Sequence, residues 1–206
     1  MKVLELFCGT KSFTKVAEAR GHECRTLDND PRFEATYCMD IMECEPSVLG
    51  DWRPDIVWAS PPCTCFSVAS IGTHWGGGRR AYEPITHEAV MAKLIVQKTV
   101  RIIEKLNPKQ YFIENPRGVL RKLCLIPYPR HTAWYCQYGD SRAKPTDIWT
   151  NLTGYTFRTC RNGATDHEEA RRGAKTGTQG RKGAIERGMV PRMLCEELII
   201  ECEKGA

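Results

Sequence analysis

The chain has 206 residues, a formal net charge of +5 and 41% hydrophobic residues, which suits one domain of ordinary size with a sizeable core. No run of about 18 apolar residues occurs, which excludes a membrane-spanning helix, and the N-terminal stretch MKVLELFCGT is too short and too acidic for a signal peptide. Neither end carries a lipidation or retention motif, so we expect a cytoplasmic protein with no membrane partner.

Predicted strands and helices alternate along most of the chain. Buried strands are predicted at 3–7, 24–27, 55–59 and 110–113, and two more at 132–137 and 147–150. Helices are predicted at 15–19, at 86–106 with Thr86 as the N-cap, and at 191–201. The apolar residues at helical spacing in the long helix are Val90, Met91, Leu94, Ile95, Ile102, Ile103 and Leu106. The alternation predicts an α/β fold with a mostly parallel twisted sheet and helices on both faces.

Reactive and polar residues stand where these strands end. The strand ends are Phe7-Cys8-Gly9, Asp28, Ser60-Pro61-Pro62-Cys63 and Glu114-Asn115-Pro116. In open α/β sheets, ligands bind beyond the carboxyl ends of the strands. A glycine turn, an acid, a thiol and a carboxylate are therefore expected to converge on one edge of the sheet, which is the candidate site.

The first two strand ends are typical of a nucleoside site. An acid at the end of the second strand binds ribose hydroxyls beside the glycine turn of the first. The turn at Gly9 lacks the G-x-G-x-x-G pattern, which argues against a pyrophosphate and hence against a dinucleotide. A nucleoside without phosphates fits better, and S-adenosylmethionine is the usual one. The alternative is a simple turn with a solvated Asp28.

The stretch Pro61-Pro62-Cys63 predicts a thiol held at the sheet edge, because the two prolines end the strand and stiffen the turn. We expect this turn to lower the pKa of Cys63 and so make it a nucleophile. The alternative is a small buried hydrophobic side chain. Glu114 ends another strand and, facing Cys63, would hold a proton or bind a ring nitrogen, or else cap a turn.

The 11 cysteines are an odd number, and most lie in apolar segments, which favours free thiols in a reducing compartment. The closest pair, Cys63 and Cys65, has the spacing C-x-C rather than C-x-x-C. With Cys160 and His167 as the other nearby candidates, this is a weak zinc pattern. We therefore expect no metal.

The excess positive charge lies in one segment. Residues 151–192 hold nine of the 30 Lys and Arg and four of the 25 Asp and Glu, which leaves 21 of each elsewhere. The same segment holds seven of the 17 glycines. A basic, glycine-rich segment on an otherwise neutral protein favours a polyanion partner; the alternative is a solvated, flexible loop.

Taken in order, these pieces resemble the motif series of the DNA cytosine-C5 methyltransferases, and in particular their short phage-encoded members. The series is Phe7-x-Gly9, Asp28, Asp40, Pro61-Pro62-Cys63, Glu114-Asn115, Gln137-Tyr138-Gly139-x-x-Arg142 and Pro191-x-x-Leu194. The resemblance runs from residue 3 to residue 198 and implies a Rossmann-like S-adenosylmethionine-dependent methyltransferase fold that binds DNA.

The resemblance also implies catalytic roles. Cys63 would attack C6 of the target cytosine, and Glu114 would bind the ring N3 and the exocyclic amine. Arg142 would support the base and O2, and Asn115 would orient the Pro-Pro-Cys loop. The cytosine C5 would then accept the methyl group of S-adenosylmethionine, and the base must leave the duplex to reach the thiol.

Cofactor and DNA contacts follow from the same resemblance. The cofactor residues it implies are Phe7, Gly9, Asp28, Asn29, Asp40, Ile41 and Pro61. Residues 66–83 would form a mobile loop that closes over DNA. The expected DNA contacts are Ser67, Arg79, Arg80, Arg171, Arg172, Lys175, Arg181 and Lys182.

The resemblance predicts three parts: a catalytic domain at 1–150, a short basic target-recognition region at 151–188, and a C-terminal helix at 189–206. The chain departs from the family pattern at Lys11 and Ser12, where glycines are usual, and at Lys144, where a second arginine is expected. The recognition region has few apolar residues, which predicts phosphate contacts and short or relaxed recognition.

Three alternatives stay open at the level of sequence. The substrate could be a nucleotide such as dCMP or a single-stranded nucleic acid rather than duplex DNA. The group transferred from the cofactor could differ from methyl. The chain could also be a DNA-binding module without catalysis, although Cys63, Glu114 and Arg142 are all present. No protein partner is evident.

Overall fold

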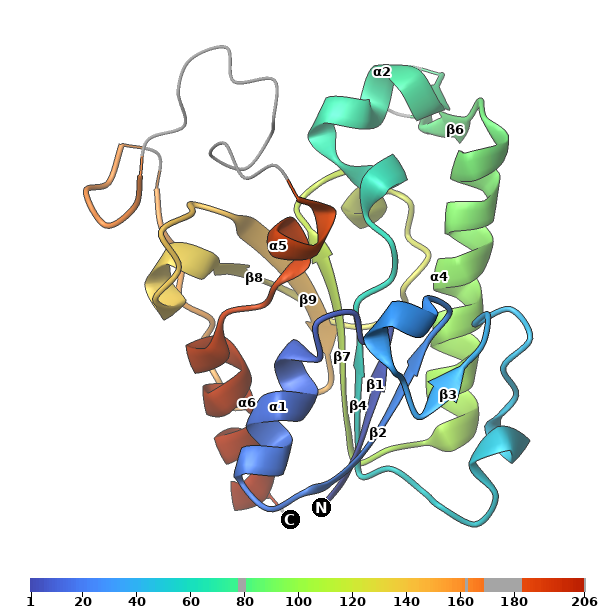
Figure 1. Ribbon diagram of the computed structural model, residues 1–206. Coiled ribbons are helices and arrows are strands. Elements are labelled where there is room, and N and C mark those ends of the chain that lie inside the picture. The colour runs from blue at the N-terminus through green and yellow to red at the C-terminus, as the bar shows by residue number, and fades with distance from the viewer. Residues whose placement is uncertain (78–80, 162, 169–182, 206) are drawn as a thin grey trace.

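A computed structural model describes residues 1–77, 81–161, 163–168 and 183–205. Its centre is a seven-stranded sheet with the order β3-β2-β1-β4-β7-β9-β8 (Figure 1). Five strands are parallel: β1 (Lys2–Leu6), β2 (Glu23–Asp28), β3 (Tyr37–Cys38), β4 (Ile56–Ala59) and β7 (Gln110–Pro116). The last two, β8 (Arg130–Trp134) and β9 (Pro145–Thr150), are antiparallel to their neighbours. The predicted mostly parallel α/β sheet is confirmed.

Helices cover both faces of the sheet. α1 (Ser12–Ala19) and α6 (Arg192–Lys204) lie on one face, and α4 (His87–Leu106) lies on the other (Figure 1). In β4, Trp58 packs toward α1 and α6, whereas its neighbour Val57 packs toward α4. A strand buried on both faces explains the unbroken apolar run that the sequence shows here.

The long helix begins and ends as its sequence predicts, but its buried face differs. Thr86 Oγ1 accepts a hydrogen bond from Ala89 N at 3.2 Å, and Asn107 ends the helix in the left-handed region at φ 45°. Val90 and Leu94 are 41% and 40% exposed. The helix lies close to the sheet through small residues such as Ala89 and Ala92, which turns these two large side chains toward solvent.

The strand predicted at 132–137 is shorter than expected. β8 ends at Trp134, and Tyr135–Tyr138 form a 3-10 turn, η6. The other short elements are η1 (Pro31–Phe33), η2 (Pro46–Leu49), η3 (Thr64–Phe66), η4 (Val68–Ser70), α2 (Ile71–His74), β5 (Trp75–Gly76), β6 (Glu83–Pro84), η5 (Val119–Lys122) and α5 (Ala184–Gly188).

The first part of the predicted recognition region lies against the catalytic domain. Leu152 and Phe157 are buried in the same core cluster as α6. Trp134 N donates a hydrogen bond to Arg158 O at 3.0 Å, which joins this segment to β8. Within the described ranges, no helix combines the length and apolar character needed to cross a membrane.

Candidate active site

A cavity of about 380 Å³ opens at the carboxyl ends of β1, β4 and β7, within the size range of small-molecule sites. Of the predicted site residues, it brings together Phe7, Gly9, Pro61, Cys63 and Glu114. The other residues that line it are Glu5, Cys8, Thr10, Ser12, Asp30, Arg32, Phe33, Ser60, Pro62, Pro116, Lys144, Ile185, Gly188 and Val190. The thiol and the carboxylate therefore do converge, as the strand ends predicted.

The loop that carries Cys63 is held from β7. Asn115 is 1% exposed, and its Nδ2 donates a hydrogen bond to Pro61 O at 2.9 Å. The chain after β7 also approaches this loop closely, since a Cβ added at Gly118 would lie 2.0 Å from Phe66 O. Asn115 and Gly118 thus position the loop from behind.

Burial raises the pKa of the Cys63 thiol, and the Glu114 carboxylate raises it further, while Lys144 opposes them. The expectation of a lowered pKa is therefore wrong for the free protein. Cys63 stands before η3, which is only three residues long. Such a short turn has almost no helix dipole to stabilise a thiolate.

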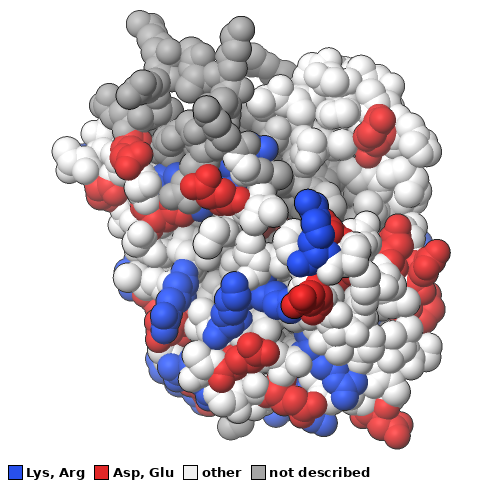
Figure 2. Space-filling model, in the orientation of Figure 1, with Lys and Arg blue, Asp and Glu red and all other residues white. Residues whose placement is uncertain are grey.

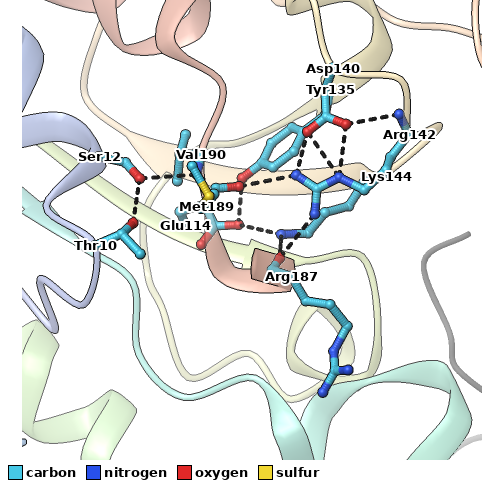
Figure 3. Close-up of polar contacts among 10 residues, drawn as sticks. All are labelled: Thr10, Ser12, Glu114, Tyr135, Asp140, Arg142, Lys144, Arg187, Met189 and Val190. Atoms are coloured by element: carbon cyan, nitrogen blue, oxygen red, sulfur yellow. Dashed lines mark hydrogen bonds and ion pairs between the residues drawn. The ribbon is translucent and has the colours of Figure 1, made fainter. Parts of the chain in front are cut away.

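Glu114 lies in a buried polar cluster. It is 5% exposed, and its Oε1 accepts a hydrogen bond from Tyr135 Oη at 2.9 Å (Figure 3). Lys144 Nζ lies 3.9 Å from the same oxygen and 4.6 Å from the centre of the Tyr135 ring. Burial lowers the pKa of Lys144, and the charge of Glu114 partly offsets that effect.

Arg142 and Lys144 occupy different positions around the cavity. Arg142 is 1% exposed, and its guanidinium forms an ion pair with Asp140 (Figure 3). The same guanidinium donates to the carbonyls of Arg187 and Met189, both at 3.2 Å. Lys144, rather than Arg142, lines the cavity. Its sequence signal was only a departure from the arginine pattern.

Beside Gly9, the acid that lines the cavity is not the one that the sequence predicts. Asp28 Oδ2 accepts a hydrogen bond from Gly9 N at 2.9 Å, and its Oδ1 accepts one from Asp30 N at 3.0 Å. These two bonds shape the turns on either side of Asp28 and leave each of its oxygens a further lone pair. Asp30, two residues later, lines the cavity with Phe33, and its carboxylate is paired with Arg32.

Three other predicted cofactor residues do not line the cavity. Asp40 is exposed and accepts a hydrogen bond from Met42 N at 2.8 Å, which closes a turn. Ile41 is 4% exposed and belongs to the core, and Asn29 is exposed. Their positions follow from the edge strand β3, which the sequence did not predict.

Glu5 also lines the cavity and was not predicted there. It is 3% exposed and accepts hydrogen bonds from Phe13 N at 3.3 Å and Thr14 N at 2.8 Å. Burial raises its pKa to about 7. In the sequence, the only sign of this role is a glutamate between the apolar residues of a strand.

The C-terminal segment connects the two halves of the site. α5 and the chain after it supply Ile185, Gly188 and Val190 to the cavity. Val190 N donates a hydrogen bond to Ser12 Oγ at 3.3 Å, and Lys144 Nζ donates to Arg187 O at 3.2 Å (Figure 3). No sequence pattern predicts that α5 and the residues after it contact both parts of the site.

The described part of the predicted DNA-closing loop is ordered around Trp75. Its ring stacks on Phe66 with centroids 5.9 Å apart, and its Nε1 donates to Cys65 O at 2.6 Å. Ser67 Oγ lies 3.1 Å from Ser70 Oγ. The remaining predicted contacts, Arg79, Arg80, Arg171, Arg172, Lys175, Arg181 and Lys182, lie outside the described residues.

Charges of both signs are interspersed over the described part of the face that Figure 2 shows. Basic side chains there alternate with acidic ones, so these residues do not form a continuous basic surface on that face.

The chain is similar to known DNA methyltransferases in sequence. The family model described as C-5 cytosine-specific DNA methylase matches residues 1–123. The chain is also 30% identical, over 225 residues, to a Frog virus 3 (isolate Goorha) protein named "Probable DNA (cytosine-5)-methyltransferase". This similarity covers 98% of the chain and 100% of the viral protein.

Solved structures share the fold at low sequence identity. A candidate DNA modification methyltransferase encoded within an E. coli prophage matches with a TM-score of 0.52 and 13% identity, over 73% of this chain and 46% of its own. A methyltransferase of Entamoeba histolytica matches with a TM-score of 0.55 and 14% identity, over 77% and 56%. The chain thus spans about half the length of these solved structures.

Proposed function

The chain belongs to the C-5 cytosine-specific DNA methylase family, and on that premise we propose that it methylates C5 of cytosine in duplex DNA with Cys63 as the nucleophile. One observation supports the roles: Cys63, Glu114 and Lys144 line a single cavity. A nucleophile, an acidic side chain and a cation are thereby available to one flipped base.

Cys63 activates the cytosine ring. C5 of cytosine is a weak nucleophile, and a bond from Cys63 Sγ to C6 moves electron density to C5. Glu114 binds N3 and the exocyclic amine and stabilises the charge that the addition places on the ring. After C5 has gained the methyl group, loss of the C5 proton to a base restores the double bond and releases the Cys63 thiolate.

Lys144 is the cation nearest to this chemistry. Its ammonium group lies 3.9 Å from Glu114 Oε1 in a site from which water is largely excluded. Electrostatic stabilisation is strongest in such buried surroundings. We assign Lys144 to the base and its O2 atom, and we assign Arg142 to positioning, because Arg142 binds Asp140 and two carbonyls behind the cavity.

S-adenosylmethionine supplies the methyl group. The residues present fit a nucleoside: Gly9 has φ +44° with no atom within 4 Å of an added Cβ, so the turn leaves open space for a ligand. Phe7 and Phe33 offer ring faces to an adenine. Asp28 stays the proposed ribose ligand, because each of its oxygens accepts one backbone hydrogen bond and has a further lone pair. The Asp30 carboxylate is instead paired with Arg32.

Duplex DNA as the substrate requires extrusion of the target base, because the thiol lies in a cavity. A base inside a stacked helix does not reach Cys63, so the target base must be extruded. The basic residues of the 151–192 segment then serve as phosphate contacts. We retain the division into a catalytic part at 1–150, a basic recognition region at 151–188 and a C-terminal helix as part of this proposal.

The test uses methyl-labelled S-adenosylmethionine with duplex DNA, single-stranded DNA, RNA and dCMP offered separately. The wild type is compared with Cys63→Ala and, as the matched control, Cys65→Ala, which retains the Cys65 carbonyl bonded to Trp75. Nucleoside mass spectrometry should find 5-methyldeoxycytidine with the wild type and the control, and none with Cys63→Ala. Label in dCMP alone, or DNA binding without product, would contradict the proposal.

A further inference from the structure

A second cluster of reactive side chains lies away from the methyl-transfer cavity. Cys136, Cys160, Asp166 and His167 each offer one ligand atom, and these atoms all lie within 4.8 Å of one another. Within the described residues, this is the one group of three or more His, Cys, Asp or Glu side chains that could hold a metal ion. We propose that these four residues bind a structural zinc ion.

The distances within the cluster match those between neighbouring ligands of tetrahedral zinc. Cys160 Sγ lies 3.6 Å from His167 Nδ1 and 3.2 Å from Asp166 Oδ1, and these nitrogen and oxygen atoms are 3.3 Å apart. Zinc binds sulfur at about 2.3 Å and nitrogen or oxygen at about 2.0–2.2 Å. A tetrahedron with those bond lengths has edges of about 3.3–3.8 Å. Because all four ligand atoms lie within 4.8 Å of one another, a zinc ion fits with movements of about 1 Å or less.

A metal ion would replace the hydrogen bonds within the cluster. Without a metal, the Cys160 thiol can donate its one hydrogen to Asp166 Oδ1 and accept a hydrogen bond from His167 Nδ1. A metal ion bound to the sulfur, oxygen and nitrogen would take the place of both bonds. Two sulfurs with an imidazole are typical of zinc among common divalent ions, because thiolate and imidazole ligands favour it over calcium or magnesium.

A supporting residue stands behind the ligands. Gln137 Nε2 donates a hydrogen bond to Asp166 Oδ2 and lies 3.9 Å from Cys136 Sγ. Metal ligands are commonly oriented by such outer hydrogen bonds. Cys136 is 9% exposed and His167 has a side chain that is 7% exposed, whereas Asp166 is 43% exposed. The site is therefore closed on the protein side and open to an entering ion at Asp166.

The site joins two segments that are distant in the sequence. Cys136 lies in η6, next to Tyr135, which bonds Glu114. Cys160, Asp166 and His167 lie at the start of the basic region, and Glu168 N donates to Ser141 O at 3.0 Å. Zinc would therefore link the start of the recognition region to η6, which carries the Tyr135 that bonds Glu114.

The experiment measures metal in the tag-free full chain. Purified from zinc-supplemented medium, the wild type and Cys124→Ser should each carry about one zinc per chain, as one four-ligand site holds one ion. Cys124 is an exposed cysteine outside the cluster and gives the matched control. Cys160→Ala should lose more than about tenfold in zinc affinity by chelator competition, since changes to outer partners alone cost 10–100-fold.

Two further readouts separate a metal site from a folding effect. Asp166→Cys replaces the oxygen ligand by sulfur and should bind zinc more tightly than the wild type, a gain that misfolding would not produce. Cobalt(II) should give the intense visible absorption of tetrahedral thiolate ligation in the wild type and not in Cys160→Ala. The proposal would be overturned by less than about 0.1 zinc per wild-type chain, for example where mass spectrometry finds a Cys136–Cys160 disulfide instead. It would also be overturned if Cys160→Ala bound as much zinc as the wild type.

Discussion

At the scale of single residues, the site separates side chains that line the cavity from side chains that bond the backbone around it. Cys63, Glu114 and Lys144 face the cavity, whereas Asn115 and Arg142 are 1% exposed and bond the backbone around it. Motif order in the sequence identified Cys63, Glu114, Asn115 and Arg142, but not Lys144 and not the division between the two sets. The division depends on which side of each element a side chain points to.

Lys144→Met should lower the single-turnover rate of methyl transfer about 100-fold, as the loss of one preorganised electrostatic contact typically does. Lys144→Arg should recover most of that rate, because it keeps the charge. DNA affinity should change little in either variant, since Lys144 is 7% exposed and faces Glu114. An unchanged rate in Lys144→Met would contradict the assignment to the base.

Cys63 in the free protein should react slowly with iodoacetamide at neutral pH. Its pKa is raised by burial and by Glu114, so the thiolate fraction is small and should increase about tenfold per pH unit until the raised pKa is reached. Peptide mass spectrometry measures the rate, with the exposed Cys124 of the same chain as reference. A rate for Cys63 that levels off below pH 8 would show the opposite shift.

At the scale of elements, the site depends on close approaches between loops that follow parallel strands. The chain after β7 supplies Asn115 to the Cys63 loop and passes against η3 at Gly118. In α5, Arg187 O accepts hydrogen bonds from Lys144 and Arg142. Just after α5, Val190 N donates a hydrogen bond to Ser12 Oγ. Each loop is therefore positioned by its neighbours.

Gly118→Ala should disable the site by displacing the Cys63 loop. The added methyl would meet Phe66 O at 2.0 Å, and that atom belongs to the backbone and must shift. We expect a loss of at least about 2 kcal/mol in unfolding free energy, typical of overpacking, together with slower methyl transfer. Gly21→Ala would not be a fair comparison, because Gly21 has φ +80°.

The matched control for that substitution is Gly72→Ala. Gly72 lies in α2 with no atom within 4 Å of an added Cβ and no positive φ. Urea unfolding and single-turnover methyl transfer should both stay near wild type for this variant. If Gly118→Ala also had wild-type stability and methyl-transfer rate, the close approach to Phe66 O would not be important for the site.

At the scale of the whole molecule, stability is coupled to pH through a group inside the site. Glu5 is 3% exposed, and its pKa is raised from 4.5 to about 7. Between those values the unfolded chain has released a proton that the folded chain retains. The stability that Glu5 confers by staying protonated is therefore complete below pH 4.5 and lost as the pH rises through 7.

The unfolding free energy of the wild type should thus include a decrease of roughly 3 kcal/mol from Glu5 between pH 4.5 and pH 7. Urea titrations across that range measure it, and Glu5→Gln removes the titrating group. The difference between the two proteins should change with pH in this window and be constant above pH 8. A difference that does not vary with pH would show that Glu5 has an ordinary pKa in the fold.

Zinc, if bound as proposed, adds a second coupling at this scale. A metal that binds only the folded chain stabilises it by mass action. Chelator treatment should therefore lower the melting temperature of the wild type and leave Cys160→Ala nearly unchanged. The change in melting temperature tests the zinc site directly and does not depend on a methyl-transfer assay.

The sequence by itself determined the fold class, the longer strands and helices in their order along the chain, and which strand ends carry Cys63 and Glu114. These features are local: apolar periodicity sets the elements, and Pro61 and Pro62 end a strand beside Cys63 wherever that strand lies. Parallel strands then bring their carboxyl ends to one edge. The convergence of Cys63 and Glu114 followed from this.

Tertiary structure alone decided which charged group lines the cavity with Cys63 and Glu114, which acids lie beside Gly9 and which cysteines meet. Lys144 and Arg142 are two residues apart on the chain, and only packing against Tyr135 and α5 directs one to Glu114 and the other to Asp140. Asp28 is oriented by two backbone donors from neighbouring turns. Such choices depend on partners distant in sequence, because a buried polar group takes the orientation in which it is hydrogen-bonded.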